Sequence, residues 1–214
     1  MVNNKNSKFI EKFISKKLSE KILLPDPFRQ FNLWFDEAKQ FEAFEPTAAV
    51  LSTVGKENHP SSRTVLLKDV NKTGFVFYTN YESRKAKELT FNPNASLLFL
   101  WKELQRQVRI EGTAEKVSHE ESEEYFHTRP RETQIGAWAS DQSSIIPDRK
   151  SLDDKFEEYS RKFGEDEIPL PDFWGGYILI PNYFEFWQGR PNRLHDRICY
   201  KLENKMWKIF RLAP

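Results

Sequence analysis

The sequence has little cysteine and no long apolar run. Cys199 is the single cysteine among 214 residues, so neither an intrachain disulfide nor a thiolate metal cluster can form, and a reducing compartment is favoured. The longest apolar stretches, such as 97–101 and 177–180, are far shorter than the roughly 20 residues that cross a bilayer. The N-terminus also lacks the apolar core of a secretory signal. We therefore expect a cytoplasmic protein without a membrane partner.

An excess of charge of either sign is also missing. The chain has 33 Lys and Arg residues against 32 Asp and Glu residues, a net charge of +1, which gives no general attraction to nucleic acid. Six lysines between Lys5 and Lys21 would allow a nucleic-acid or membrane-surface arm, but a solvated segment is the commoner outcome for such a run. We predict no nucleic-acid partner.

Several motifs of common enzyme classes are absent. The sequence has no glycine-rich P-loop, no dinucleotide fingerprint, no His-Glu-x-x-His motif and no nucleophile elbow. These absences argue against a P-loop enzyme, a zinc hydrolase and a serine esterase, and we predict no metal site.

The length suits one well-buried domain with short appendages. We expect residues 1–25 to form a flexible N-terminal appendage, which ends at Leu24-Pro25-Asp26-Pro27, and residues 26–214 to form the domain. Apolar residues recur at intervals of three and four over 27–41, which predicts a helix with Asp26 as its N-cap. The same reasoning predicts helices over 83–89, 118–127 and 152–163.

Short runs rich in β-branched and aromatic residues predict strands. The expected strands are 47–54, 63–70, 74–80, 95–101, 107–117, 176–180, 184–188, 197–202 and 206–212. The turn-forming stretches between the early strands indicate an antiparallel meander. The fold class predicted is mainly β with peripheral helices (α+β), arranged as a small closed or nearly closed barrel.

Two basic groups could bind anions. Arg63 and Lys68 are five positions apart on an expected strand, so they point to opposite sides and could serve two different anions. Arg84 and Lys85 follow Ser83 at an expected helix start, where backbone N–H groups already favour a phosphate. Solvent-exposed basic residues remain the alternative for both groups, and for Arg63 and Lys68 it is favoured.

Three further segments combine polar and aromatic residues. Tyr125 and Arg129 lie four residues apart near a helix end and, with Thr133, could hold a phosphate dianion, although packing and capping are the commoner roles. The stretch 134–144 is interpreted as a loop that could contact a ligand or be purely structural. The stretch 184–197 concentrates an indole, an imidazole and two guanidinium groups that suit a planar aromatic ligand, although a lone surface histidine is the commoner role for His195.

Taken together, these segments resemble the pyridoxine/pyridoxamine 5'-phosphate oxidase family from about Asp26 to Pro214. The most specific matches are 185–189 (EFWQG), 193–197 (RLHDR) and 207–214 (WKIFRLAP). The resemblance implies an FMN-binding split β-barrel, a homodimer with FMN at the subunit interface, and FMN as cofactor. The sequence departs from the family pattern at Thr133, where Ser is common. Residues 1–24 also do not match the family's substrate-covering segment.

The resemblance also implies roles for individual residues. The implied cofactor-binding residues are Arg63, Thr64, Val65, Leu66, Leu67, Lys68, Tyr78, Thr79, Arg84, Lys85, Gln107, Gln142, Ser143, Trp187 and Arg197. The implied substrate-binding residues are Lys68, Tyr125, Arg129, Thr133, Arg193, Leu194 and His195. Arg193 and His195 are the implied catalytic residues, with roles in orientation and electrostatics.

The implied reaction oxidises pyridoxine or pyridoxamine 5'-phosphate to pyridoxal 5'-phosphate, with O2 as acceptor and H2O2 as product. The alternative is a non-catalytic FMN-binding split-barrel protein, a flavin carrier or sensor. The retained substrate residues argue against this alternative, because a protein that only binds flavin has no need of them.

Overall fold

The computed structural model describes residues 18–42 and 44–214, which fold mainly into β structure with peripheral helices, as predicted. The strands are β1 (Ala48–Val54), β2 (Pro60–Leu66), β3 (Asp69–Val70), β4 (Phe75–Asn80), β5 (Asn94–Trp101), β6 (Arg106–Lys116), β7 (Trp174–Gln188), β8 (Asp196–Glu203) and β9 (Met206–Leu212). The helices are α2 (Pro27–Phe41), α3 (Arg84–Phe91), α4 (His119–His127), α5 (Arg131–Ala139), α6 (Arg149–Phe163) and the 3-10 turn η1 (Pro191–Arg193). None of the helices in the described ranges is long and apolar enough to cross a membrane.

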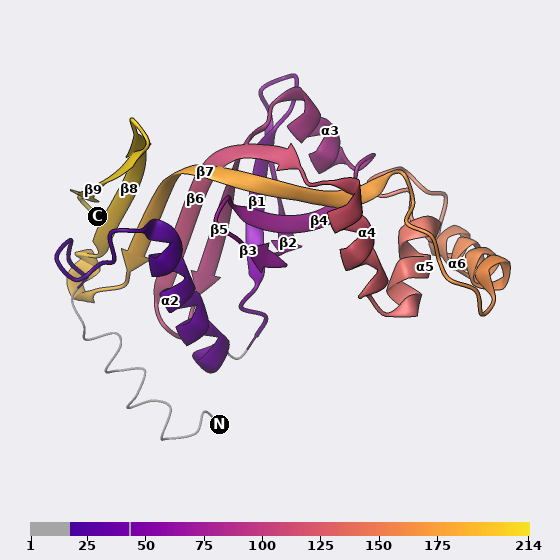
Figure 1. Cartoon of the computed structure of the whole chain (residues 1–214), viewed down its shortest axis with the longest axis horizontal. Coiled ribbons are helices and arrows are strands. Elements are labelled where there is room, and N and C mark those ends of the chain that lie inside the picture. Colours follow the sequence, from indigo (N-terminus) through magenta and orange to yellow (C-terminus); the bar gives the residue numbers. More distant parts are fainter. Residues whose placement is uncertain (1–17, 43) are drawn as a thin grey trace.

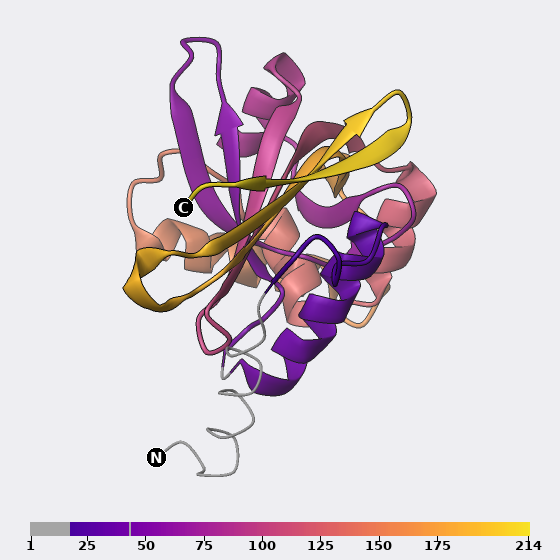
Figure 2. The same cartoon turned by 90° about the vertical axis from the view of Figure 1, so that its left-hand side faces the viewer.

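The long strand β7 organises the sheet. It pairs with β6 from Tyr177 to Gln188, with β4 through its first half and with β8 through its second half. The sheet order is β2-β1-β5-β6-β7-β4-β3, and β8, which also pairs with β7, carries β9. Figure 1 shows α4, α5 and α6 beyond one end of β7, and β8 and β9 at its other end. Figure 2 shows the curl of the strands, with α2 in indigo beside them. The two ends of β7 therefore lie in different parts of the molecule.

Three sequence predictions about the strands were wrong in detail. The strands expected at 176–180 and 184–188 are one strand, because a β-bulge opposite Glu111 and Gly112 accommodates Pro181. A side chain at Gly112 would lie 2.0 Å from the Ile180 carbonyl oxygen, so glycine is required at the bulge. The expected meander does not form either, since β4 pairs with β7 rather than with β2.

The strand expected at 63–70 is interrupted at Leu67 and Lys68. Leu67 N donates to the Thr47 carbonyl at 2.9 Å, whereas Lys68 N donates to the Val76 carbonyl at 2.8 Å. The chain therefore passes from pairing with β1 to pairing with β4 between these two residues. This change of partner leaves the Lys68 side chain outside the regular ladder.

Helix α2 covers the inner face of the curled sheet. Asp26 caps it by accepting from Phe28 N at 2.9 Å, as predicted. Phe31 is fully buried and contacts the rings of Phe75 and Phe99 at 4.9 and 5.1 Å between centroids. A second apolar cluster joins α4, α5 and α6 to the start of β7 through Phe126, Ile135, Phe163 and Trp174.

The stretch expected as a loop at 134–144 is helical up to Ala139, so that prediction was wrong for 134–139. Ile135 and Ala139, four residues apart, are both buried, and this apolar pair holds the helix despite Gly136. Residues 140–144 lie outside a helix.

Most of the expected appendage at 1–25 lies outside the described residues. The part from Leu18 onward contacts the sheet: Leu18 N donates to Asp196 at 3.2 Å, and Tyr200 donates to the Leu24 carbonyl at 2.7 Å. Leu23 is also buried. This end of the segment is therefore fixed to β8.

Candidate functional site

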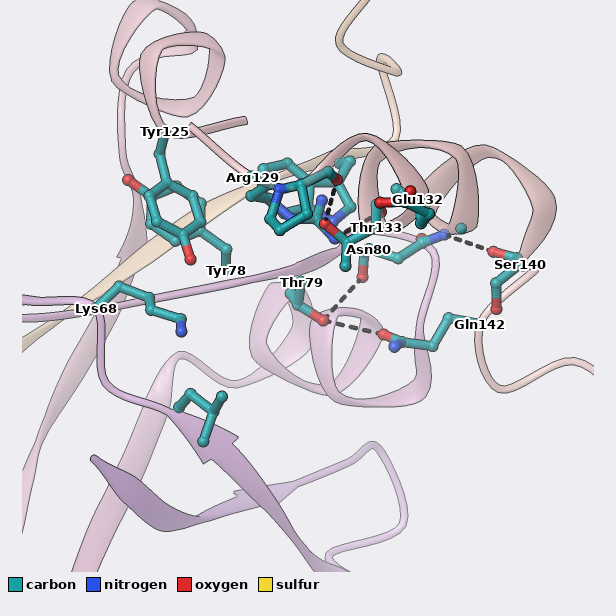
Figure 3. A pocket seen from close by; sticks show the side chains of 15 residues that line it. Lys68, Tyr78, Thr79, Asn80, Tyr125, Arg129, Glu132, Thr133, Ser140 and Gln142 are labelled. Carbon is teal, nitrogen blue, oxygen red and sulfur yellow. Dashed lines mark hydrogen bonds between the residues drawn. The ribbon is translucent and has the colours of Figure 1, made fainter. Parts of the chain in front are cut away.

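A cavity of about 670 Å³ lies where the end of β4, the start of β7 and helices α4 and α5 meet (Figure 3). Eight residues predicted for the site line it: Leu66, Lys68, Tyr78, Thr79, Tyr125, Arg129, Thr133 and Gln142. The structure thus brings together residues that are up to 76 positions apart between Leu66 and Gln142. They come from both predicted groups, cofactor-binding and substrate-binding.

Three parallel aromatic rings form one wall of the cavity. Tyr78 and Tyr125 stack with centroids 3.9 Å apart, and Trp174 lies 5.4 Å from Tyr78. Gly176 makes this possible, because a Cβ atom there would lie 2.9 Å from the Tyr78 ring. Burial raises the pKa of Tyr78, so its hydroxyl stays protonated and can donate. Trp174 is not among the residues predicted from the sequence, where its only signal is its place directly before Gly175-Gly176.

Arg129 adds a cation to the same wall and forms no ion pair with a carboxylate of residues 18–42 or 44–214. Its guanidinium carbon lies 4.6 Å from the Trp174 ring centroid, and Nη2 donates to the Thr133 carbonyl at 2.8 Å. Nη1 is buried and has no hydrogen-bond partner among the residues that the structure describes. A buried donor without a partner is costly, so an anionic ligand group would stabilise it. Figure 3 shows Arg129 and Lys68 on opposite sides of the hollow.

The Thr133 hydroxyl has a different orientation from the one expected for a phosphate contact. It donates to the Pro130 carbonyl at 2.7 Å, within the first turn of α5. Its oxygen is therefore an acceptor toward the cavity, and it must rotate before it can donate to a phosphate.

A second cation, Lys85, lies behind the cavity and contacts two of the residues that line it, Thr79 and Gln142. Its amine donates to Gln142 Oε1 at 2.8 Å and to Thr79 Oγ1 at 3.0 Å, and Thr79 also donates to Gln142 at 3.1 Å. Burial, and then the charge of nearby Arg63, lower the pKa of Lys85 to about 8. Lys85 and Arg63 are close enough that the charge of Arg63 lowers the pKa of Lys85, and an anion bound between them would relieve this repulsion.

Arg63 and Arg84 meet at the buried carboxylate of Glu88. Arg63 Nη2 lies 3.1 Å and Arg84 Nε 2.8 Å from its oxygens, and Thr53 and Ser61 donate to it at 2.5 and 2.6 Å. Burial raises the pKa of Glu88, but these hydrogen bonds outweigh it and lower the value to about 2. Sequence reasoning missed Glu88. The spacing of Arg84 and Glu88 predicts an ion pair, but the contact to Arg63 spans 25 residues.

Arg63, Arg84 and Lys85 together form a cation group at the start of α3. Through Arg84 this group borders a second hollow of about 920 Å³ between α3 and the β1–β2 turn. Arg84, Gln142 and Ser143 line it, and all three are predicted cofactor residues. Ser143 has a left-handed backbone with φ of 73°. Thr64, Val65 and Leu67 complete the predicted segment on or just after β2.

The remaining predicted residues lie at the far end of β7. Gln107, Trp187 and Arg197 are adjacent across three strands, because Gln107 pairs with Trp187 and Trp187 with Arg197. Arg197 Nε donates to the buried Glu185 carboxylate at 2.6 Å, and His195 lies 4.6 Å from the Trp187 ring. In the loop beside them, Arg193 and Leu194 are exposed.

One chain does not join its two groups of site residues. Trp174 in the cavity and Trp187 at the far end are 13 positions apart on β7, which is roughly 43 Å of extended strand. A ligand of the size of FMN cannot contact both ends. The structure therefore gives one cavity and one separate row of residues in each chain.

The curled antiparallel sheet defines a split β-barrel. Two solved structures share it. PhzG from Burkholderia lata, in complex with tetrahydrophenazine-1-carboxylic acid, has a TM-score of 0.88 and 29% identity over 94% of this chain and 98% of that one. A pyridoxamine 5'-phosphate oxidase-related, FMN binding protein from Nostoc punctiforme has a TM-score of 0.70 and 14% identity over 90% and 100%.

The chain belongs to the pyridoxamine 5'-phosphate oxidase family. The family model described as pyridoxamine 5'-phosphate oxidase matches residues 35–163, and the pyridoxine 5'-phosphate oxidase C-terminal dimerisation region matches 174–214. A pyridoxine/pyridoxamine 5'-phosphate oxidase of Rippkaea orientalis is 55% identical over 95% of this chain and 97% of its own length. One from Salinibacter ruber is 51% identical over 95% and 96%.

Proposed function

We propose that the chain is an FMN-dependent oxidase that converts pyridoxine or pyridoxamine 5'-phosphate to pyridoxal 5'-phosphate, with O2 as acceptor and H2O2 as product. The observation that carries this is the buried Arg129 Nη1 beside an aromatic wall, which has no hydrogen-bond partner in the described part of the chain, together with relatives named pyridoxine/pyridoxamine 5'-phosphate oxidase. We also propose a cytoplasmic location, on the single cysteine.

The substrate phosphate is assigned to the part of the cavity between Arg129 and Lys68. Arg129 and Lys68 supply positive charge, Tyr125 supplies a hydroxyl, and Thr133 supplies a second one after rotation. A guanidinium with a free donor edge binds a phosphate dianion strongly. The cavity also extends to Leu66, which leaves room for the pyridine ring beside these groups.

The FMN phosphate is assigned to the cation group at the start of α3. Arg63, Arg84 and Lys85 carry three positive charges, and Glu88 with its single negative charge neutralises only part of them. Gln142 and Ser143 border the same group. These residues fit a phosphate, and FMN bound there would supply the acceptor for the two electrons that leave the substrate.

A homodimer explains why the site residues fall into two groups. Gln107, Trp187 and Arg197 lie on the outer face of the sheet, as does Leu66 at the rim of the cavity. Between them this face exposes Val50 and Leu100, with exposed fractions of 37% and 65%. A twofold axis through this apolar face would place the row of Gln107, Trp187 and Arg197 of one chain against the cavity of the other chain. Residues 174–214 match the family's dimerisation region, which supports this arrangement.

In this dimer, Arg193 and His195 would reach the substrate from the partner chain. Both stand on the loop after β7, and Arg193 is exposed, so its guanidinium is accessible to a ligand. We assign Arg193 to pressing the pyridine ring onto the flavin and, with His195, to holding the oxygen attached to C3 of that ring. These are contributions to orientation and electrostatics rather than proton abstraction.

The test is an oxidase assay on the purified chain with FMN, in air, that compares pyridoxine 5'-phosphate with pyridoxine. We expect pyridoxal 5'-phosphate and H2O2 in equal amounts, and a kcat/KM for unphosphorylated pyridoxine lower by at least about a hundredfold, because Arg129 and Lys68 then lack their anion. FMN binding without turnover of either compound would show a flavin carrier or sensor instead.

A further inference from the structure

The loop between β7 and β8 is held in a conformation that its sequence does not favour. Asn192 and Arg193 have φ values of 59° and 60°, in the left-handed region. Non-glycine residues adopt this region in succession only where surrounding contacts hold them there. Contacts that fix this loop therefore also fix the two residues it presents, Arg193 and His195.

Asp196 is the centre of those contacts. Its carboxylate accepts from Arg190 Nε at 2.7 Å and from Arg211 Nη1 at 2.7 Å, and Leu18 N donates to it at 3.2 Å. The side chains of Arg190 and Asp196 are only 12% and 16% exposed. Burial raises the pKa of Asp196, but the arginine hydrogen bonds outweigh it and keep the pKa below its usual value. The pair therefore stays charged and closes the loop at its base.

Arg190 also determines how His195 presents its ring. The Arg190 backbone N–H donates to His195 Nδ1 at 3.1 Å, while the Trp187 ring lies 4.6 Å away at 43°. A nitrogen that accepts a hydrogen bond carries no proton, so the neutral imidazole carries its proton on Nε2. Nε2 is then a hydrogen-bond donor to a ligand.

We propose that Asp196 and Arg190 are positioning residues that hold loop 190–195 so that His195 offers Nε2–H as a donor to an oxygen acceptor on the substrate ring. The proposal rests on the proposed oxidase function for the identity of the substrate. It assigns His195 to donating a hydrogen bond and excludes it as the base, because Nε2 already carries the proton.

The tautomer can be measured independently of turnover. In the FMN-loaded protein labelled with ¹⁵N-histidine, long-range ¹H–¹⁵N spectra distinguish the two neutral tautomers, and the His195→Gln variant identifies the His195 signals among four histidines. We expect Nε2–H in the wild type and a mixture of tautomers in Asp196→Asn. An Nδ1–H form in the wild type would overturn the proposal even if the enzyme turns over. A wild type without turnover would instead refute the proposed function and leave the tautomer result standing.

Kinetics test the positioning role. Asp196→Asn and Arg190→Met should each raise KM about tenfold, the factor lost with one hydrogen bond to a charged group, and change kcat by less than about threefold. Arg190→Lys should recover part of the loss. The matched control is Glu20→Gln, which breaks the Glu20–Arg211 pair but leaves Arg190 and Asp196 together, and should leave KM unchanged. Equal KM values in all these variants, with lowered melting temperatures in the first two, would show a purely structural role.

Two substitutions of His195 separate a donor from a base. The amide N–H of Gln reaches the position of Nε2, whereas Asn reaches only that of Nδ1. His195→Gln should therefore keep kcat/KM within about tenfold of the wild type, and His195→Asn should lose more. Equal, severe losses in both variants would contradict the donor assignment.

Discussion

Glu88 should make the free energy of unfolding fall as the solution becomes acidic. Its folded pKa is about 2 against an ordinary value of 4.5, and its side chain is only 9% exposed. Because the folded value is lower, the stabilisation is complete above pH 4.5 and is lost as the pH falls toward about 2. The difference between these values, at about 1.4 kcal/mol for each pH unit, corresponds to about 3 kcal/mol.

Glu88→Gln keeps the size and one acceptor oxygen but removes the charge that Arg63 and Arg84 contact. We expect the free energy of unfolding at pH 7 to fall by about 3 kcal/mol, and the difference from the wild type to shrink steadily below pH 4.5. The assay is urea unfolding at several pH values, with FMN and protomer concentrations held constant since both contribute to apparent stability.

The matched control is Glu82→Gln, an exposed acid close to the same hollow. It should change the free energy of unfolding by less than about 0.5 kcal/mol at any pH. If wild type and Glu88→Gln lose stability in parallel between pH 5 and pH 3, the carboxylate is not the charged centre of the cation group, and the reasoning fails.

Three further changes test other parts of the account. Arg129→Met should raise KM for pyridoxine 5'-phosphate by roughly a hundredfold or more, measured by initial rates, and a KM within a factor of two would remove Arg129 from the phosphate site. Leu100→Asp places a charge on the exposed apolar face and should convert the dimer to monomers in light scattering, whereas a persistent dimer would place the interface elsewhere. Cys199 is fully buried, and burial raises the pKa of its thiol. A thiol reagent should therefore leave the folded protein unmodified and modify one thiol per unfolded chain. Rapid modification of the folded protein would contradict the packing of β8.

Local patterns predicted most secondary structure well. Helix α2 has its predicted limits and N-cap, and β9 matches the expected strand 206–212, because each has a clear periodicity and a clear end signal. Errors arose where tertiary contacts decide. Pro181 suggests a strand end, yet the bulge at Gly112 lets β7 continue, and Gly136 suggests a loop, yet buried Ile135 and Ala139 keep α5 helical.

The site was predicted as a list of residues rather than as a geometry. Resemblance to a family supplied both groups of residues, and the structure places Lys68, Tyr125 and Arg129 around one cavity. Sequence could not reveal that Trp174 completes the aromatic wall or that Glu88 holds Arg63, because these contacts depend on strand pairing and long-range packing. It also could not show that Trp187 lies at the opposite end of the same strand from Trp174.

The most direct test of an oxidase site shared between two chains is complementation between Arg129→Met and Arg193→Ala. When the two variants are co-expressed with different tags and the mixed dimer is purified, one of its two sites carries both changes and the other carries neither. We expect two nearly inactive parents and a mixed dimer with about half the wild-type rate of pyridoxal 5'-phosphate and H2O2 formation. A mixed dimer as inactive as its parents would show that each site is built from one chain, and would contradict the account.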